Sequence, residues 1–346
     1  MDKIIGLGNA LVDVLATLKD DTLLDELELP KGSMQLIDDA KLQQINTKFS
    51  QMKTHLATGG SAGNAILGLA CLGAGTGFIG KVGNDFFGKQ LEQTIIDVGI
   101  DASGLQKDDD VHTTLALVHT YPDGDRDFSF YRNPGADMML TEAEVPEELI
   151  KGTRIFHFGT LSMTHEGVRN ATKKALRAAK EAGAVISFDP NLREPLWNSL
   201  DEAKEQVLYG LGQCDILKIS DNEIQWLTGE EDFTKGVHWI LERYHIPLIL
   251  VSMGREGSRA YYKDLIVEVK PFIQKNTIET TGAGDTFCAC VLHYILEHGL
   301  TDLTENDLKE MLTFANAAAS IITTRKGALR VMPEREEVEK LLSCFN

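Results

Sequence analysis

The sequence predicts an α/β fold in which a mostly parallel sheet carries a small β-sheet lid. After residue 150, short apolar strands alternate with helical stretches, which is the pattern of βαβ units. Two strand-containing segments, at residues 11–45 and 106–137, fall outside this alternation and predict a separate small sheet. A length of 346 residues suits one large domain with such an appendage.

The first half of the chain contains the predicted lid and a glycine-rich helix. Its expected elements, in order, are strands at 3–8 and 12–18, a helix at 22–27, a turn at 30–32, a strand at 33–37, helices at 38–52 and 62–72, and a strand at 76–81. Residues 113–121 and 127–132 flank a turn sequence at 122–125 and predict a hairpin. We assign 11–45 and 106–137 to the lid, and 1–10, 46–105 and 138–346 to the core.

The second half of the chain predicts the parallel sheet. Apolar strands are expected at 154–159, 184–189, 216–220 and 248–254, and a helical stretch separates each strand from the next. This order requires right-handed crossover connections. It also places bound ligands at the carboxyl ends of the strands.

Composition excludes several classes of function. The formal net charge of −18 argues against broad binding to nucleic acid or to an anionic membrane, since both need clustered Lys and Arg. The five cysteines and nine histidines show no zinc-ligand spacing, and the odd number of cysteines favours reduced thiols in the cytoplasm. Residues 75–82, GTGFIGKV, lack the Ser or Thr of a Walker A loop and follow a helix, which excludes a dinucleotide-binding turn.

The strongest chemical signal is ETTGAGDTF, residues 279–287, at the predicted start of a helix. Its glycines leave the amides of the first turn bare, so this turn can bind an anion such as a phosphoryl group. Asp285 lies in the same turn, where a carboxylate can accept the proton of a hydroxyl that attacks phosphorus. A glycine turn whose aspartate merely caps the helix explains the spacing equally well.

A family resemblance favours the first of these interpretations. TTGAGDTF resembles the C-terminal signature of the PfkB carbohydrate kinases, and residues 59–83 resemble their N-terminal glycine-rich signature. Further matches are Gly8-Asn9 with Asp13 and the segments 188–193, 222–229, 251–257 and 316–319. The resemblance implies a ribokinase-like three-layer α/β/α core, a β lid over a sugar, ATP as phosphoryl donor with Mg²⁺, and Asp285 as general base.

The resemblance also implies roles for individual residues. Gly282, Ala283 and Gly284 would form the hole for the transferred phosphoryl group, and Glu223 would join the Mg²⁺ shell through water. The implied substrate contacts are Asp13, Gly59, Gly60, Asn64, Arg132 and Arg193. The implied ATP contacts are Ser220, Ser252, Gly254, Gly257 and Asn316.

Two residues depart from the family pattern. Ser220 stands where the family has Asn, three residues before the acidic Glu223. Glu279 replaces the Asp that precedes TTGAGD in many members, in the loop where a monovalent cation such as K⁺ binds.

Four of the implied substrate contacts have simpler explanations. Asp13 could pair at a strand end, and Asn64 could satisfy backbone groups in a turn. Arg193 could form a surface ion pair. Arg132 could be a charge that protects an edge strand from aggregation.

The nature of the acceptor stays open at this point. Residues 130–137 and 188–197 resemble fructokinases or 2-keto-3-deoxygluconate kinases, whereas 8–14 and 29–38 resemble bacterial adenosine kinases. A non-catalytic binding protein with the same pocket is a third possibility, although binding alone would not require Asp285. The apolar lid strands also predict a homodimer formed through the lid.

Overall fold

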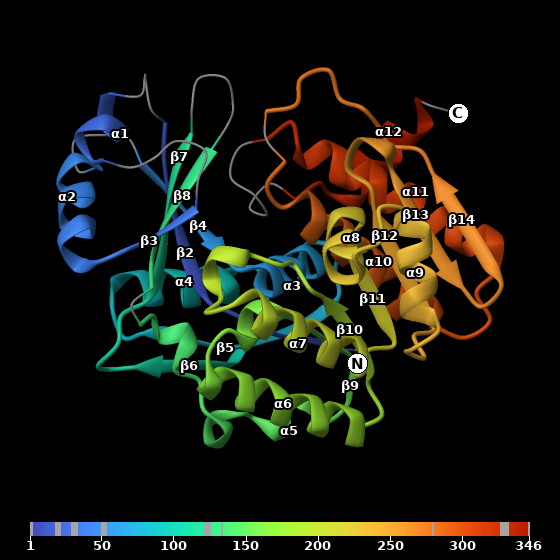
Figure 1. Ribbon diagram of the computed structural model, residues 1–346, viewed down its shortest axis with the longest axis horizontal. Helices are drawn as coiled ribbons and strands as arrows, with labels where there is room; N and C mark the ends of the chain where they lie inside the picture. The colour runs from blue at the N-terminus through green and yellow to red at the C-terminus, as the bar shows by residue number, and fades with distance from the viewer. Residues whose placement is uncertain are drawn as a thin grey trace.

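The computed structural model describes residues 3–17, 22–28, 34–49, 54–120, 126–132, 134–278, 280–325 and 332–344. Nine strands form a large sheet in the order β14-β13-β12-β11-β10-β9-β1-β5-β6 (Figure 1). The strands are β1 (Lys3–Leu7), β5 (Gly75–Gly83), β6 (Asp101–Asp108), β9 (Thr153–Gly159), β10 (Val185–Asp189), β11 (Ile216–Ser220), β12 (Leu248–Ser252), β13 (Ser258–Tyr262) and β14 (Leu265–Val269). Pairing is parallel from β6 to β12, and β13 and β14 add an antiparallel edge. The predicted mostly parallel sheet is confirmed.

Helices cover both faces of this sheet, and a buried apolar core lies on each side. The first core includes α3 (Ser61–Cys71), α4 (Phe86–Asp97), α10 (Ala283–His298), α11 (Glu305–Ile322) and α12 (Arg335–Ser343). The second includes α5 (Glu147–Ile150), α6 (Glu166–Glu181), α7 (Leu200–Leu211), α8 (Asp221–Thr228) and α9 (Phe233–Leu241). Within the described ranges, no helix is long and apolar enough to cross a membrane.

Strand residues alternate between the two cores. Leu250 belongs to the first core, and its neighbours Ile249 and Val251 belong to the second. Strands that are buried on both faces form nearly continuous apolar runs, which explains why the sequence predicted them clearly. A polar residue inside such a run is therefore conspicuous.

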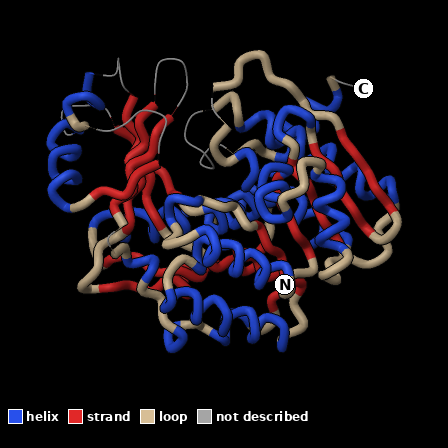
Figure 2. Tube along the Cα trace, viewed as in Figure 1, coloured by secondary structure: helices blue, strands red, loops and turns tan. Residues whose placement is uncertain are grey.

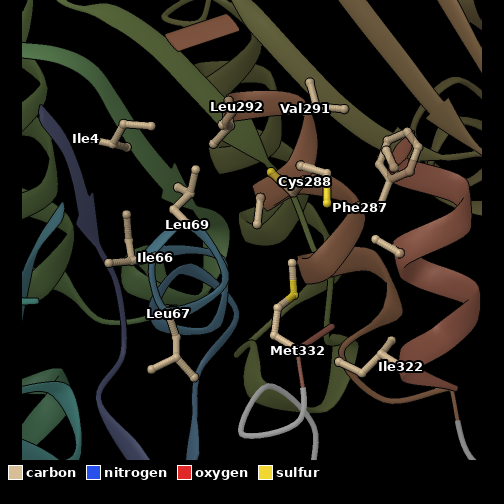
Figure 3. Packing of buried hydrophobic residues seen from close by; sticks show 14 of the residues in the cluster. Ile4, Ile66, Leu67, Leu69, Phe287, Cys288, Val291, Leu292, Ile322 and Met332 are labelled. Atoms are coloured by element: carbon tan, nitrogen blue, oxygen red, sulfur yellow. The ribbon is translucent and has the colours of Figure 1, made fainter. Parts of the chain in front are cut away.

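Helices α3 and α10 pack against each other over the first face of the sheet. In Figure 3, Leu69 of α3 lies on the side of its helix that faces Cys288 and Leu292 of α10. All three side chains are buried, and a Cβ at Gly68 would lie 2.8 Å from the Cβ of Ala289 in α10. This apolar contact sets the position of the first turn of α10 relative to that of α3.

Five further strands form a small sheet in the order β3-β8-β7-β2-β4, seen at the upper left of Figure 2. They are β2 (Leu11–Thr17), β3 (Met34–Ile37), β4 (Thr54–Gly59), β7 (Thr114–Thr120) and β8 (Arg126–Tyr131). Val12 and Leu117 pack into the first core with residues of α1 (Thr22–Glu26) and α2 (Asp39–Phe49). Leu11, Ala116 and Phe130 form a separate buried cluster.

The order of strands in the large sheet reverses at β1. From β1 the later strands β5 and β6 extend to one side, and β9 to β12 extend to the other. A crevice opens at the carboxyl ends of strands where such a reversal occurs. The small sheet begins at Leu11, only four residues beyond the end of β1, so it stands beside this crevice.

The predicted lid differs from the small sheet at two boundaries. We assigned residues 46–105 to the core, but β4 is an edge strand of the small sheet because it pairs antiparallel with β2. Residues 106–108 belong to β6 in the large sheet. The predicted hairpin of β7 and β8 is confirmed, whereas the turn sequences at 30–32 and 122–125 lie outside the described residues.

A titratable group within the core makes stability depend on pH. His157 on β9 is buried, and its Nδ1 lies 3.0 Å from Ser187 Oγ. Burial, helped by the positive charge of Lys218, lowers the pKa of His157 to about 4, so the folded protein keeps this ring neutral. The unfolded chain binds a proton below pH 6.5, so stability falls as pH decreases from about 6.5 towards 4.

We therefore expect His157→Gln to make the protein less sensitive to acid. Glutamine can replace the hydrogen bond to Ser187 but does not titrate. Between pH 7.5 and 5.5, wild type should lose about 1 kcal/mol more of unfolding free energy than the variant does. Urea unfolding at both pH values measures this difference, and identical losses would show that His157 does not contribute.

Candidate active site

A cavity of about 340 Å³ lies between the small sheet and the carboxyl ends of β1, β9, β10 and β11. Asn9 follows β1, Leu161 follows β9, Asn191 follows β10 and Lys218 is the central residue of β11. The small sheet contributes Leu11, Asp13 and Phe130, and Arg132 lies just beyond β8. The remaining lining residues are Gly60, Ser61, Asn64, Arg193, Leu196, Thr280, Thr281, Gly282, Gly284 and Asp285. The cavity therefore occupies the crevice that the strand order creates.

Asp285 lies in the first turn of α10, at the wall of this cavity. Ser61 Oγ donates to Asp285 Oδ1 at 2.7 Å, and Asn64 Nδ2 donates to Oδ2 at 2.8 Å. Both donors come from the first turn of α3. Asn64, which we predicted to bind substrate, thus orients the candidate base. Its own Oδ1 is buried and has no partner among the described residues.

The first turn of α10 offers unpaired amides to the cavity. Gly282 is the residue before the helix and has φ 79°, a left-handed conformation that favours glycine. In the described part of the chain, the amides of Gly284 and Asp285 have no acceptor, as expected for a first turn. The amide of Ala283 donates to the Thr280 carbonyl at 3.2 Å. Of the residues predicted to form the anion hole, Gly284 thus has a bare amide, whereas the amide of Ala283 is engaged within the turn.

A buried ion pair lies directly beneath this turn. Lys218 Nζ is 2.9 Å from Asp189 Oδ2, and the amide of Asn191 donates to Asp189 Oδ1 at 3.1 Å. A Cβ at position 284 would lie 3.2 Å from Lys218 Nζ. The glycine at 284 therefore leaves room for this ammonium group to approach the turn.

The environment keeps both members of the pair ionised near neutral pH. Burial raises the pKa of the Asp189 carboxyl to about 6, in spite of the attraction to Lys218. Burial opposes the charge on Lys218, but the carboxylates of Asp189 and Glu223 outweigh it and raise the pKa of the ammonium group above its usual value. Lys218 is therefore a cation near neutral pH at the cavity wall.

Asp13 lies on β2, between Ala57 of β4 and Ala116 of β7. A Cβ at position 59 would lie 2.7 Å from Asp13 Oδ1 and 2.3 Å from Leu11 Cδ1. Gly59 and its small neighbours therefore leave space for a carboxylate that faces the cavity. The predicted pair of Asp13 and Gly59 is close in space, and Gly60 lines the cavity beside them.

The two predicted arginines have different environments. Arg132 is buried, and its Nε and Nη2 lie 2.9 Å and 2.7 Å from Asp137 Oδ2, while Thr114 donates to the other oxygen of Asp137. Arg132 follows β8, which lies inside the small sheet, so it is not a charge on an edge strand.

Arg193 is exposed at the cavity mouth and has no carboxylate partner among the described residues. Its alternative explanation, a surface ion pair, is therefore not observed.

Ser220 and Glu223 form a capping box at the start of α8. The amide and hydroxyl of Ser220 both donate to Glu223 Oε2 at 2.8 Å. Glu223 Oε1 accepts from the amide of Leu192 at 2.8 Å. This carboxylate therefore holds the loop that contains Asn191 and Arg193 against the start of α8.

The other predicted ATP contacts gather beside this cap. Ser252 ends β12 directly opposite Ser220 in parallel register, and Gly254 begins the next turn. Asn316 Nδ2 donates to the carbonyls of Val269 and Lys270 at 3.1 and 3.3 Å, and a Cβ at Gly257 would lie 2.2 Å from the same Val269 oxygen. In the part of the chain that the structure describes, these residues do not line the 340 Å³ cavity.

Comparison with known proteins identifies the family. Residues 32–335 match the model of the pfkB family carbohydrate kinases. The chain belongs to the pfkB family. It is therefore an ATP-dependent phosphotransferase that acts on a sugar hydroxyl, and the comparisons do not favour the alternative of a binding protein without catalysis.

Individual relatives of this pfkB kinase are fructokinases. Fructokinase-1 of Oryza sativa subsp. japonica is 41% identical over 286 residues, which cover 83% of this chain and 88% of that protein. The structure is similar to that of Xylella fastidiosa fructokinase with bound ATP, with a TM-score of 0.83, 26% identity and coverage of 99% and 98% of the two chains. It is also similar to the structure of a Vibrio cholerae O395 fructokinase double mutant with fructose, ADP and potassium ion bound. That match has a TM-score of 0.81 and 26% identity, and it covers 99% of this chain and 98% of that one.

Sequence reasoning missed two residues of the pfkB kinase site that carry potential chemistry. Ser61, beside the predicted Gly60, donates to Asp285. Lys218 is a lysine inside the otherwise apolar strand β11, and that break in the pattern could have revealed it. No sequence pattern indicates which partner or cavity either side chain faces.

We expect Asp285→Asn to lower the kcat of the pfkB kinase by about 10²–10⁴-fold, because an amide cannot accept the hydroxyl proton. The fold should persist, since the amide oxygen can still accept one of the two hydrogen bonds from α3. Steady-state release of ADP measures kcat, and thermal unfolding measures stability. Asp201→Asn, in the exposed first turn of α7, is the matched control and should leave kcat unchanged. A turnover near that of wild type in the Asp285 variant would rule out its role as base.

Proposed function

We propose that this pfkB kinase transfers the γ-phosphoryl group of ATP to a hydroxyl of fructose. The observation that carries the proposal is the carboxylate of Asp285, held by two donors beside bare helix amides in a cavity with hydroxyl-binding walls. Asn9 and Asn64 each contribute a buried Oδ1 without a partner among the described residues. Unpaired buried acceptors are unfavourable, so they favour a ligand rich in hydroxyl donors.

The similarity to fructokinases supports fructose over adenosine as the acceptor. The plant relative named above is a fructokinase at 41% identity, and the structural match with the fructose-bound fructokinase covers almost the whole chain. Asp13, Arg193 and Asn64 surround the cavity with polar groups that can bind a polyol. We therefore retain these residues, with Gly59, Gly60 and Arg132, as the proposed sugar site.

The proposed reaction is an in-line transfer. The acceptor hydroxyl attacks the γ-phosphorus, its proton passes to Asp285, and the bond to the bridging oxygen breaks with its electron pair leaving on ADP. The amides of Gly284 and Asp285 stabilise the charge of the moving phosphoryl group. The small sheet limits access of water, which would otherwise be an acceptor.

The chain offers only indirect support for a metal ion. Glu223 Oε2 already accepts two hydrogen bonds and Oε1 accepts one, so one lone pair remains, on Oε1. That fits a water in the Mg²⁺ shell, and the described residues contain no cluster of three or more His, Cys, Asp or Glu that could hold a metal alone. When bound with ATP, Mg²⁺ would neutralise charge on its phosphates.

Four further points remain proposals. Ser220, Ser252, Gly254, Gly257 and Asn316 would border ATP at the carboxyl ends of β11 and β12. A K⁺ ion would bind in the loop before α10, where Glu279 lies outside the described residues. A cytoplasmic location and a homodimer formed through the small sheet are predictions from the sequence.

Acceptor preference tests the proposed function directly. ADP release should be measured with Mg-ATP and fructose, ribose, 2-keto-3-deoxygluconate or adenosine, with Asp285→Asn as the inactive control. We expect the highest kcat/KM with fructose and slow ATP hydrolysis without an acceptor. A clear preference for adenosine or ribose would overturn the assignment of fructose and leave the kinase activity intact.

The role of Asp13 can be tested separately with Asp13→Asn. A hydrogen bond from a hydroxyl to a carboxylate contributes about 1.5–3 kcal/mol, so the KM for fructose should rise by about 10–100-fold. The KM for ATP should change by less than about threefold, because the loss is confined to ground-state binding of the sugar. An unchanged KM for fructose would remove Asp13 from the sugar site.

A further inference from the structure

We propose that Lys218 contacts the γ-phosphoryl group of ATP during transfer, and that Asp189 is the residue that positions it. This inference rests on the proposed phosphoryl transfer at Asp285, but it does not depend on which sugar is the acceptor. It adds a side-chain cation to the backbone amides of α10. Neither residue was among the site residues predicted from the sequence.

The direction of the strand residues places Lys218 under α10. Ile216 belongs to the core on the α10 face, whereas Leu217 and Ile219 belong to the opposite core. Because side chains alternate along a strand, Lys218 shares the face of Ile216. Its Nζ lies 3.2 Å from the Cβ position of residue 284, and both Lys218 and Gly284 line the cavity.

The ammonium group has hydrogen-bonding capacity left for a ligand. A lysine has three donors, and the ion pair with Asp189 uses one of them. No other acceptor for Lys218 Nζ is found among the described residues. Asp189 is itself fixed by the amide of Asn191, so the position of Nζ is set before a ligand arrives. A buried cation with free donors at a cavity wall is suited to an anion.

The charge on Lys218 matches the change in charge during transfer. The acceptor oxygen forms a bond to phosphorus, the bond to the bridging oxygen breaks towards ADP, and the hydroxyl proton goes to Asp285. Lys218 gives up no proton, since neighbouring carboxylates raise the pKa of its ammonium group. It stabilises negative charge on the γ-phosphoryl oxygens, and Gly284 is small enough to let it approach them.

The test removes the charge while keeping the shape. We expect Lys218→Met to reduce kcat by about 10²-fold or more, the usual effect of losing one such donor, with little change in the KM for fructose. Wild type should bind the non-hydrolysable analogue AMP-PNP more tightly than ADP. The variant should lose that difference, because its affinity for ADP should hardly change. Calorimetric titration measures both affinities without turnover.

A second variant separates loss of charge from loss of folding. Removing Lys218 alone leaves Asp189 buried without its partner, which is destabilising. Lys218→Met combined with Asp189→Asn leaves no unpaired charge, so it should regain stability but not activity. Recovery of kcat in this double variant to within threefold of wild type would overturn the proposal.

Lys81 provides a matched control. Its side chain is 8% exposed, as is that of Lys218, and it pairs with Asp108 at 3.0 Å and Glu144 at 2.8 Å. It does not line the cavity in the described structure. Lys81→Met should therefore lower the thermal midpoint but leave kcat and the preference for AMP-PNP over ADP unchanged. Equal effects of the two lysine variants would indicate a purely structural role for Lys218.

A structure of the wild type with ADP, fructose and aluminium fluoride gives a test that needs no variant. Lys218 Nζ should lie about 3 Å from a fluoride that replaces a γ-phosphoryl oxygen. A distance beyond hydrogen-bonding range would refute the contact. If wild type ignores fructose yet distinguishes AMP-PNP from ADP through Lys218, the proposed acceptor fails and the role of Lys218 stands.

Discussion

Ser61 and Asn64, on the first turn of α3, donate to the two carboxylate oxygens of Asp285, which lies 224 and 221 positions further along the chain. The rest of the site depends on this contact, because it aims the carboxylate and sets where the bare amides of α10 point. The apolar packing of α3 against α10 maintains it, with side chains such as Leu69 and Leu292 fully buried. A core contact thus determines the geometry of the proposed base.

The charge of the site differs from that of the molecule. A chain with a net charge of −18 repels a nucleotide at long range, so the phosphates must be held by local groups. Lys218, Arg132 and Arg193 supply positive charge at the cavity, and the first turn of α10 adds its dipole. Burying Lys218 with Asp189 is expensive in solvation, which points to a function beyond stability.

The capping box of α8 connects two parts of the site. Glu223 closes the cap with Ser220 and also accepts from the amide of Leu192, in the loop that carries Arg193. A displacement of this carboxylate would therefore reach the loop of Asn191 and Arg193 through a hydrogen bond. The same contacts explain why an acidic residue at 223 suits the start of this helix.

The sequence by itself determined the parallel sheet, the lid hairpin and the importance of the turn before α10. Apolar strand runs and glycine turns are local signals, and together with the family resemblance they made Asp285, Asp13 and the glycines around them candidates for the site. The tertiary structure decided the rest: that β4 joins the small sheet, that Asn64 orients Asp285, and that Lys218 lies beneath Gly284. These relations join residues distant along the chain, and only packing specifies them, because local propensity carries no record of which side chains meet.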